Sequence, residues 1–188
     1  QLRVVAPNRL QKHLGLCRSL RNLGHFVTMR DAAGAAFRSA QSALERSQLL
    51  PCVVQAAWRL GQWDDVRTLL ATCAGNAGRA DGHLASSVSH ASSYAFESSL
   101  PASRPTIPLC DRSLMTSDDL YETELAHTLL ALHDGSACAL AEHATAARRA
   151  LIPQIAAAGM DSYARTYGSL IKLQVLQELQ AAAALHAG

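Results

Sequence analysis

The chain has 188 residues and a formal net charge of +2, and 49% of its residues are hydrophobic against 17% charged. That length suits one domain or a short run of stacked repeats, and the apolar content excludes a disordered chain. Ala and Leu supply about a third of the residues while aromatic residues supply 5%, so the composition disfavours a β-rich fold and predicts an all-α one.

The first predicted helix carries one apolar stripe. Leu10, Leu14, Cys17 and Leu20 recur at helical spacing. Gly24 follows directly after Leu23 and is expected to end the helix in a left-handed conformation. A second, Ala-rich helix is expected over residues 27–47.

Two more helices are expected before residue 74. Pro51 suits the first turn of the third helix, which Gly61 is expected to end. Asp64 is expected to cap the fourth helix, and Asp65 adds negative charge to its first turn. We interpret these two carboxylates as helix-start residues and not as an acid–base pair. An apolar stripe then runs over residues 66–73.

The ends of the first and third helices share a short motif. A Leu-Gly-polar-aromatic sequence occupies residues 23–26 and returns 37 residues later, a spacing close to the period of helical-pair repeats. The Gly is expected to turn the chain, and the aromatic residue to wedge between helices. The residues given this structural role are Leu23, Gly24, Phe26, Leu60, Gly61 and Trp63.

Two aromatic pairs have alternative interpretations. Trp58 and Trp63 flank the same turn, which favours core aromatics over an anchor for a binding partner, although both remain open. Tyr163 and Tyr167 are spaced i and i+4, and we interpret them as a packing pair within the last predicted helix.

Residues 74–116 interrupt the helical pattern. Their Gly, Ser and Pro content predicts a flexible insertion with one short helix around residues 84–96. Two sets of helical repeats, over residues 1–73 and 117–188, are expected to flank this insertion.

Helical order is predicted to resume at Thr116–Asp119, which is a strong helix-start sequence. Gly135 is expected to close that helix. The next helix is expected to run until Pro153 forces a kink or a restart. The last helix, over about 161–185, is apolar over so wide an arc that two neighbours are expected to cover it.

Reactive residues form no familiar constellation. The five cysteines lie 21–37 residues apart, so they are interpreted as reduced core thiols and not as a disulfide framework or zinc site. His127, His133 and His143 are interpreted as surface or capping histidines. The sequence holds no phosphate loop, kinase motif or esterase motif. We therefore expect no catalytic, cofactor-binding or metal-binding residue.

Charge and hydropathy also argue against two kinds of partner. Basic residues occur at most in pairs such as Arg148–Arg149, which disfavours direct binding to nucleic acid. No apolar stretch approaches the length of a membrane span. The chain begins with Gln1 and shows no signal-peptide pattern, so we expect it to be a piece of a longer protein.

Three segments carry a family resemblance. Residues 13–24, residues 55–64 (QAAWRLGQWD) and residues 162–179 resemble, in the same order, the FAT region of the phosphatidylinositol-kinase-related protein kinases. They are most similar to the ATR-type DNA-damage checkpoint kinases. With the intervening helices the resemblance covers about two-thirds of the chain. Segment 74–116 departs from the family pattern and is interpreted as a lineage-specific insertion.

The resemblance implies an α-solenoid of antiparallel helical pairs, similar to tetratricopeptide and HEAT repeats. This solenoid would wrap the kinase domain of a large nuclear serine/threonine kinase. It implies that the parent uses ATP and Mg²⁺ outside this chain, so enzyme status depends on the parent. The implied partners are the kinase domain, neighbouring repeats and an ATRIP-type protein. A second hypothesis is a stand-alone tetratricopeptide-like adaptor that binds a protein partner in its concave groove, and a third is an unrecognised helical enzyme.

Overall fold

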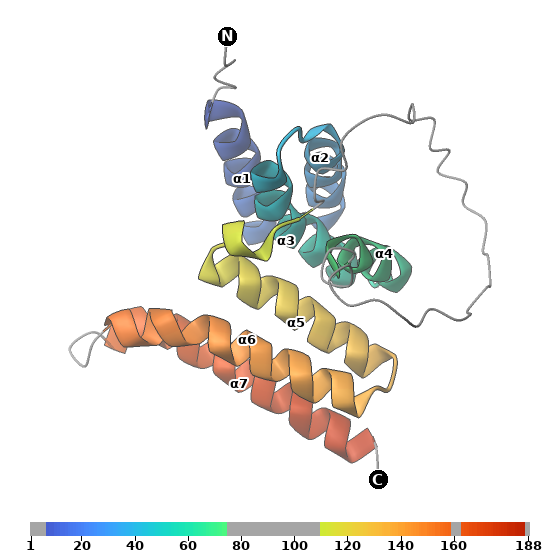
Figure 1. Ribbon diagram of the computed structural model, residues 1–188, viewed down its shortest axis with the longest axis vertical. Helices are drawn as coiled ribbons and strands as arrows, with labels where there is room; N and C mark the ends of the chain where they lie inside the picture. Colours follow the sequence, from blue (N-terminus) through green and yellow to red (C-terminus); the bar gives the residue numbers. More distant parts are fainter. Residues whose placement is uncertain (1–6, 75–109, 159–162, 187–188) are drawn as a thin grey trace, which may run out of the picture.

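The structure is a computed structural model that describes residues 7–74, 110–158 and 163–186 (Figure 1). Across these ranges the ordered elements are α-helices and one 3-10 turn, without strands, so the all-α prediction is confirmed. The elements are α1 (Pro7–Asn22), α2 (Phe26–Ser39), α3 (Ala43–Arg59), α4 (Trp63–Ala74), the 3-10 turn η2 (Arg112–Leu114), α5 (Ser117–His133), α6 (Ala137–Ala158) and α7 (Tyr163–His186).

The helices form consecutive antiparallel pairs that stack along the long axis (Figure 1). α1 pairs with α2, α3 with α4, and α5 with α6, and α7 packs on α6. Contacts of α2 with α3, and of α3 and α4 with α5, join each pair to the next. The described ends of the chain lie at opposite ends of the stack. This is the predicted α-solenoid.

Three glycines end the first helix of each pair in the same way. Gly24, Gly61 and Gly135 have φ values of 73°, 71° and 72°. At the second turn the backbone N–H of Gly61 donates to the Trp58 carbonyl at 3.1 Å, and that of Gln62 donates to the Ala57 carbonyl at 3.0 Å. Equivalent bonds occur at the other two glycines. These are Schellman turns, as the glycine positions predicted.

The predicted second helix over 27–47 is wrong, because two helices share that range. α2 ends before Ser42, whose side-chain oxygen accepts a hydrogen bond from the backbone N–H of Glu45 at 3.1 Å. The Glu45 carboxylate accepts one from the backbone N–H of Gln41 at 2.9 Å. This reciprocal cap starts α3 at residue 43. Pro51 consequently lies inside α3 and not in its first turn.

Two other expected boundaries differ from the structure. α4 begins at Trp63, so Asp64 lies in its first turn, 3.1 Å from the Arg67 guanidinium, and does not occupy the cap. α6 continues through Pro153 without a restart. Pro153 cannot donate to the carbonyl of Arg149, but both residues are exposed, so water can satisfy that carbonyl.

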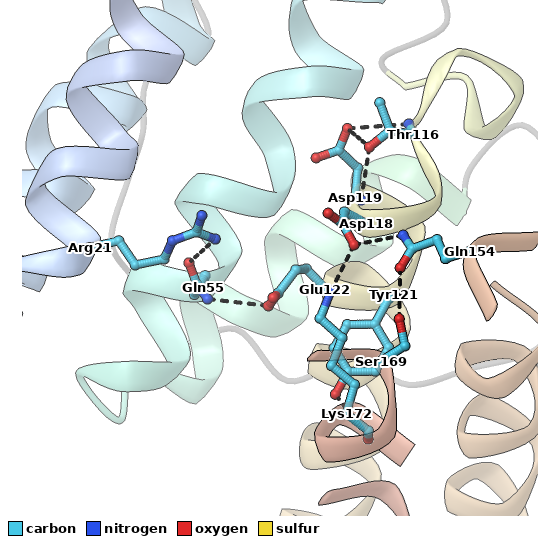
Figure 2. Close-up of polar contacts among 10 residues, drawn as sticks. All are labelled: Arg21, Gln55, Thr116, Asp118, Asp119, Tyr121, Glu122, Gln154, Ser169 and Lys172. Carbon is cyan, nitrogen blue, oxygen red and sulfur yellow. Dashed lines mark hydrogen bonds and ion pairs between the residues drawn. The ribbon is translucent and has the colours of Figure 1, made fainter. Parts of the chain in front are cut away.

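The start of α5 is the predicted one. Thr116 accepts a hydrogen bond from the backbone N–H of Asp119 at 3.2 Å, and the Asp119 carboxylate accepts one from the backbone N–H of Thr116 at 3.2 Å (Figure 2). This capping box stabilises the first turn.

Most of the predicted insertion, including its short helix over 84–96, lies outside the described residues. Its last seven residues, 110–116, are described and belong to the helical body. Cys110 and Met115 are buried, and the Ser47 hydroxyl of α3 accepts a hydrogen bond from the backbone N–H of Asp111 at 2.9 Å. The division into two sets of repeats and an insertion stays a prediction.

Apolar clusters follow the stack from one pair to the next. One cluster joins α1, α2 and α3 and contains Cys17, Met29, Ala33, Val53 and Ala56. A second joins α3, α4 and α5 and includes Leu50, Val54, Val66, Leu70 and Ala126. A third joins α5, α6 and α7 and contains Tyr121, Leu125, Ala147, Leu151 and Leu176. Stability is thus distributed along the stack, as in other repeat folds.

Candidate functional site

A polar network joins the first helices of the three pairs (Figure 2). The guanidinium of Arg21 on α1 donates to the Gln55 amide oxygen on α3, with 3.5 Å between nitrogen and oxygen. The amide nitrogen of Gln55 donates to the Glu122 carboxylate on α5 at 3.2 Å. We call these three residues the inter-pair network. Arg21 and Gln55 are 34 residues apart in the sequence, and Gln55 and Glu122 are 67 residues apart, so the network connects helices that are distant along the chain.

Gln55 is the central residue of this network, and it is buried. It lies on the inner face of α3, between Val54 and Ala56, and only 7% of it is exposed. A buried amide without partners would be costly, so both ends of its side chain are bonded. Burial also raises the pKa of Glu122, although Lys172 and Arg21 act in the opposite direction. The network therefore depends on close approach of all three helices.

A second network binds α5, α6 and α7 together (Figure 2). The Asp118 carboxylate accepts hydrogen bonds from Gln154 at 2.8 Å and from Lys172 at 2.7 Å. The Ser169 hydroxyl donates to the Gln154 amide oxygen at 3.2 Å, and the Tyr121 hydroxyl donates to the Lys172 carbonyl at 3.3 Å. We call these five residues the C-terminal network.

Partial loss of solvent around the largely exposed Asp118 opposes its charge, but the hydrogen bonds from Lys172 and Gln154 hold the pKa of its carboxyl below the usual value. Burial raises the pKa of Tyr121. Asp118 is therefore charged and Tyr121 neutral near neutral pH, which are the states that their bonds require.

Both networks border a groove of about 620 Å³. α1, α3, α5 and Lys172 of α7 contribute most of its lining, so the groove follows the first helices of the pairs. Its charged residues have mixed sign, with Arg18 and Arg21 from α1 and Asp119 and Glu122 from α5. Such a surface offers no concentrated field of one sign.

A histidine pair lies between α5 and α6. The rings of His127 and His143 stack with their centroids 4.4 Å apart. Burial lowers the pKa of His127 to about 4 and also lowers that of His143. The neutral His143 ring donates from Nδ1 to the buried Glu124 carboxylate at 2.9 Å, and Glu124 also forms an ion pair with Arg112. In the ranges that the structure describes, no three His, Cys, Asp or Glu residues are grouped to hold a metal ion.

One arginine contacts an aromatic residue of the first Leu-Gly motif and the tryptophan that precedes the second. The Arg59 guanidinium lies 4.3 Å from the centroid of the Trp58 ring and 5.5 Å from that of Phe26. Phe26 packs on the first apolar cluster and Trp58 on the second. The buried indole nitrogen of Trp58 has no hydrogen-bond acceptor among the described residues, so packing holds the ring.

The remaining motif residues have different surroundings. Trp63 packs on the second cluster and stacks on His133 of α5, with 4.8 Å between ring centroids, so it contacts the next pair. Leu60 is half-buried at the end of α3, whereas Leu23 is 69% exposed. The structural role proposed for these residues stays a prediction.

The predicted tyrosine pair lies at the start of α7. Tyr167 is 52% exposed on that helix. Tyr163 is the first residue of α7, and its side chain lies outside the described part of the chain. The structure therefore does not test whether these two rings pack together.

Sequence reasoning missed both networks and the histidine pair. Gln55 gave a usable signal, because a lone amide inside an apolar helix face needs a buried partner. Glu124 gave a similar signal on α5, where Tyr121, Leu125 and Ala126 lie near it in the sequence. Their partners could not be named, because they come from helices distant in the sequence.

Comparison with known proteins gives one family and a consistent set of relatives. The model of the FAT domain matches residues 50–188. The chain is 28% identical to "Serine/threonine-protein kinase ATR" of Arabidopsis thaliana over 178 residues, which is 94% of this chain and 5% of that protein. It is 29% identical to the proteins of the same name from Oryza sativa subsp. indica and subsp. japonica, each over 179 residues, with the same coverage.

The chain thus spans about 5% of the length of these curated relatives. No solved structure matches it. Among the helices that the structure describes, none has the length and hydropathy that crossing a membrane requires.

Proposed function

The chain belongs to the FAT-domain family, and from this premise we propose that it is a helical scaffold segment of an ATR-like serine/threonine protein kinase. In this proposal the parent acts in the DNA-damage checkpoint in the nucleus. The segment supports the kinase domain and regulates its activity. ATP and Mg²⁺ would bind to the kinase domain of the parent. The partners would be that domain, the neighbouring repeats and an ATRIP-type protein.

The observation that carries the proposal is the continuity of the stack. Apolar clusters and the inter-pair network connect α1, α3 and α5 without a break, through contacts of 3.5 and 3.2 Å. A displacement of one pair must therefore shift or break contacts with the next. In stacked repeats each unit contacts only its neighbours, so a displacement is passed from one unit to the next. This supports a mechanical role, in which partner binding at one place changes the position of a distant domain.

The inter-pair network provides the test. In the full-length kinase, Gln55→Leu removes the central amide but keeps a side chain of similar size in an apolar environment. We expect activation of the kinase by its protein partner to fall several-fold, while the KM for ATP stays unchanged because the ATP site lies elsewhere. Kinase assays with and without the partner would measure both quantities.

Gln48→Leu is the matched control. Gln48 lies on the same helix and also lines the groove, but it is not part of the inter-pair network. We expect this variant to behave as the unmodified protein. Equal activation of the Gln55→Leu and Gln48→Leu kinases would contradict the regulatory proposal. Measurable ATP binding by residues 1–188 alone would contradict the scaffold role itself.

The groove favours a second candidate, a stand-alone adaptor that binds a protein segment. Its volume of about 620 Å³ and its position along the first helices of the pairs suit a bound peptide. The reading frame distinguishes the two candidates. A kinase domain encoded downstream would support the scaffold, and a stop codon shortly after residue 188 would support the adaptor.

A further inference from the structure

Two cysteines from different helical pairs meet in one wall of the groove. Cys17 comes from α1 and Cys52 from α3, and both line the groove. Cys17 is buried in the first apolar cluster, and the half-buried Cys52 packs against that cluster. Both side chains carry free thiols. The pair therefore lies at the interface between the first and second helical pairs, with access from the groove at Cys52.

The two thiols interact with each other. A hydrogen bond from Cys52 lowers the pKa of Cys17, and the nearby Arg21 guanidinium adds to this effect. The same hydrogen bond raises the pKa of Cys52, which keeps its proton. Thiolates are the reactive form of cysteine, and the common position of the two residues in one cluster and one groove wall places a second thiol beside whichever one reacts. Cys138 is exposed on α6 and serves as a reference thiol.

We propose that Cys17 and Cys52 are a reversible oxidation site, at which a peroxide converts the two thiols into a disulfide between α1 and α3. One of the two thiols loses its proton and attacks the peroxide as a thiolate, the O–O bond breaks, and a sulfenic acid and water form. The sulfur of the other cysteine then attacks the sulfenic acid sulfur and loses its proton, and the hydroxyl leaves as a second water. Two thiols and one hydrogen peroxide thus give one disulfide and two waters, and a dithiol reductant reverses the change.

The bridge would lock the first helical pair to the second. It would cross-link residues 35 positions apart in the sequence, which restricts the unfolded chain and holds α1 against α3. Under the proposed scaffold function this would stiffen one interface of the stack. The bridge itself does not depend on that function, so a failure of the kinase experiments above would leave it standing.

Peptide mapping tests the proposal. The purified protein is treated with hydrogen peroxide, free thiols are blocked with N-ethylmaleimide, and the protein is digested with trypsin. Cleavage after Lys12, Arg18, Arg46 and Arg59 places the two cysteines in short peptides, residues 13–18 and 47–59. We expect these peptides to appear as one cross-linked species that a phosphine reductant removes. The melting temperature of the oxidised protein should rise by about 5–10 °C.

Two variants make the test decisive. Cys52→Ser should abolish the cross-linked peptide, because Cys17 then has no partner thiol in the groove wall. Cys138→Ser should form the bridge as the unmodified protein does. Full alkylation of both Cys17 and Cys52 after peroxide treatment would overturn the proposal. Linkage of Cys17 to another cysteine would also overturn it.

Discussion

At the N-terminal end of the stack, the buried residues of the first cluster, which joins α1, α2 and α3, are mostly small, whereas at the C-terminal end a dense hydrogen-bond network adds to the apolar contacts. The first cluster relies on residues such as Ala33 and Ala56, and its polar link from Arg21 to Gln55 is 3.5 Å long. The third cluster contains Tyr121 and two fully buried leucines, Leu151 and Leu176.

The contrast indicates which interface of the stack separates more easily. Small side chains allow close approach but lose little apolar area when two helices slide, whereas larger side chains and short hydrogen bonds fix a position. We therefore infer that the N-terminal interface opens before the C-terminal one. The proposed oxidation site lies at the N-terminal interface, where a covalent bond would change the behaviour of the stack most.

The largest expected effect is at the C-terminal cluster. Leu151 is fully buried, and Leu151→Ala should lower the free energy of unfolding by about 3–5 kcal/mol, because it removes apolar contacts and leaves a cavity. Its neighbour Ile152 is 60% exposed, so Ile152→Ala should cost less than about 1 kcal/mol. Urea denaturation followed by circular dichroism measures both. Similar losses for the two variants would show that α6 does not bury the face that the structure assigns to it.

A residue of the C-terminal half, His127, should make the stability of the protein depend on pH. The pKa of His127 is about 4 in the folded protein against an ordinary 6.5. The unfolded chain therefore binds more protons than the folded one between these values, so stability is complete above pH 6.5 and falls as the pH drops towards 4. Because His127 is partly exposed, we expect this loss to be about 1–2 kcal/mol.

His127→Phe keeps an aromatic ring against His143 and removes the titrating group, so it should flatten the pH profile. His25→Gln, which changes an exposed histidine at the first Schellman turn, is the matched control for the loss of a histidine. Denaturation midpoints between pH 4 and 7 give the comparison. An unchanged slope in His127→Phe would place the pH dependence elsewhere.

Both ends of the stack contain a Schellman turn, and replacing its glycine should lower the free energy of unfolding by a similar amount at each end. Gly24→Ala and Gly135→Ala each place a side chain at a φ near 72°, which costs about 1–2 kcal/mol. Gly15→Ala, inside α1 and without any atom within 4 Å of the added carbon, should instead stabilise by about 0.5–1 kcal/mol. Thermal denaturation distinguishes these signs. Unequal costs at Gly24 and Gly135 would mean that the turns themselves contribute to the difference between the two ends.

Sequence reasoning succeeded where the signal was local. Gly24, Gly61 and Gly135 each end a helix, and Thr116 begins one, because the turn chemistry is contained in a few neighbouring residues. It failed at Ser42. The cap that Ser42 forms with Glu45 starts a new helix, whereas the Ala-rich pattern predicts one continuous helix and Pro51 predicts a later helix start. The local signal, Ser42 followed three residues later by Glu45, is weaker than the helical periodicity around it.

The networks were out of reach for a different reason. Gln55 can be recognised as a residue that needs partners, but Arg21 and Glu122 reach it only after three helices have packed. The same holds for the Cys17–Cys52 pair, whose wide separation in the sequence argued against any pairing. A spacing rule reports local structure, whereas these contacts depend on the order in which the pairs stack.

The smallest expected effect tests the contrast between the two ends directly. A double-mutant cycle with Asp118→Asn and Lys172→Met should give a coupling energy of about 0.5 kcal/mol, because the pair is close but Asp118 is largely exposed. The cycle with Arg21→Met and Gln55→Leu should give less, because a 3.5 Å contact is at the limit of a hydrogen bond. Added salt should weaken only the first coupling, since Gln55 carries no charge. A larger coupling between Arg21 and Gln55 would reverse the inference that the N-terminal interface yields first.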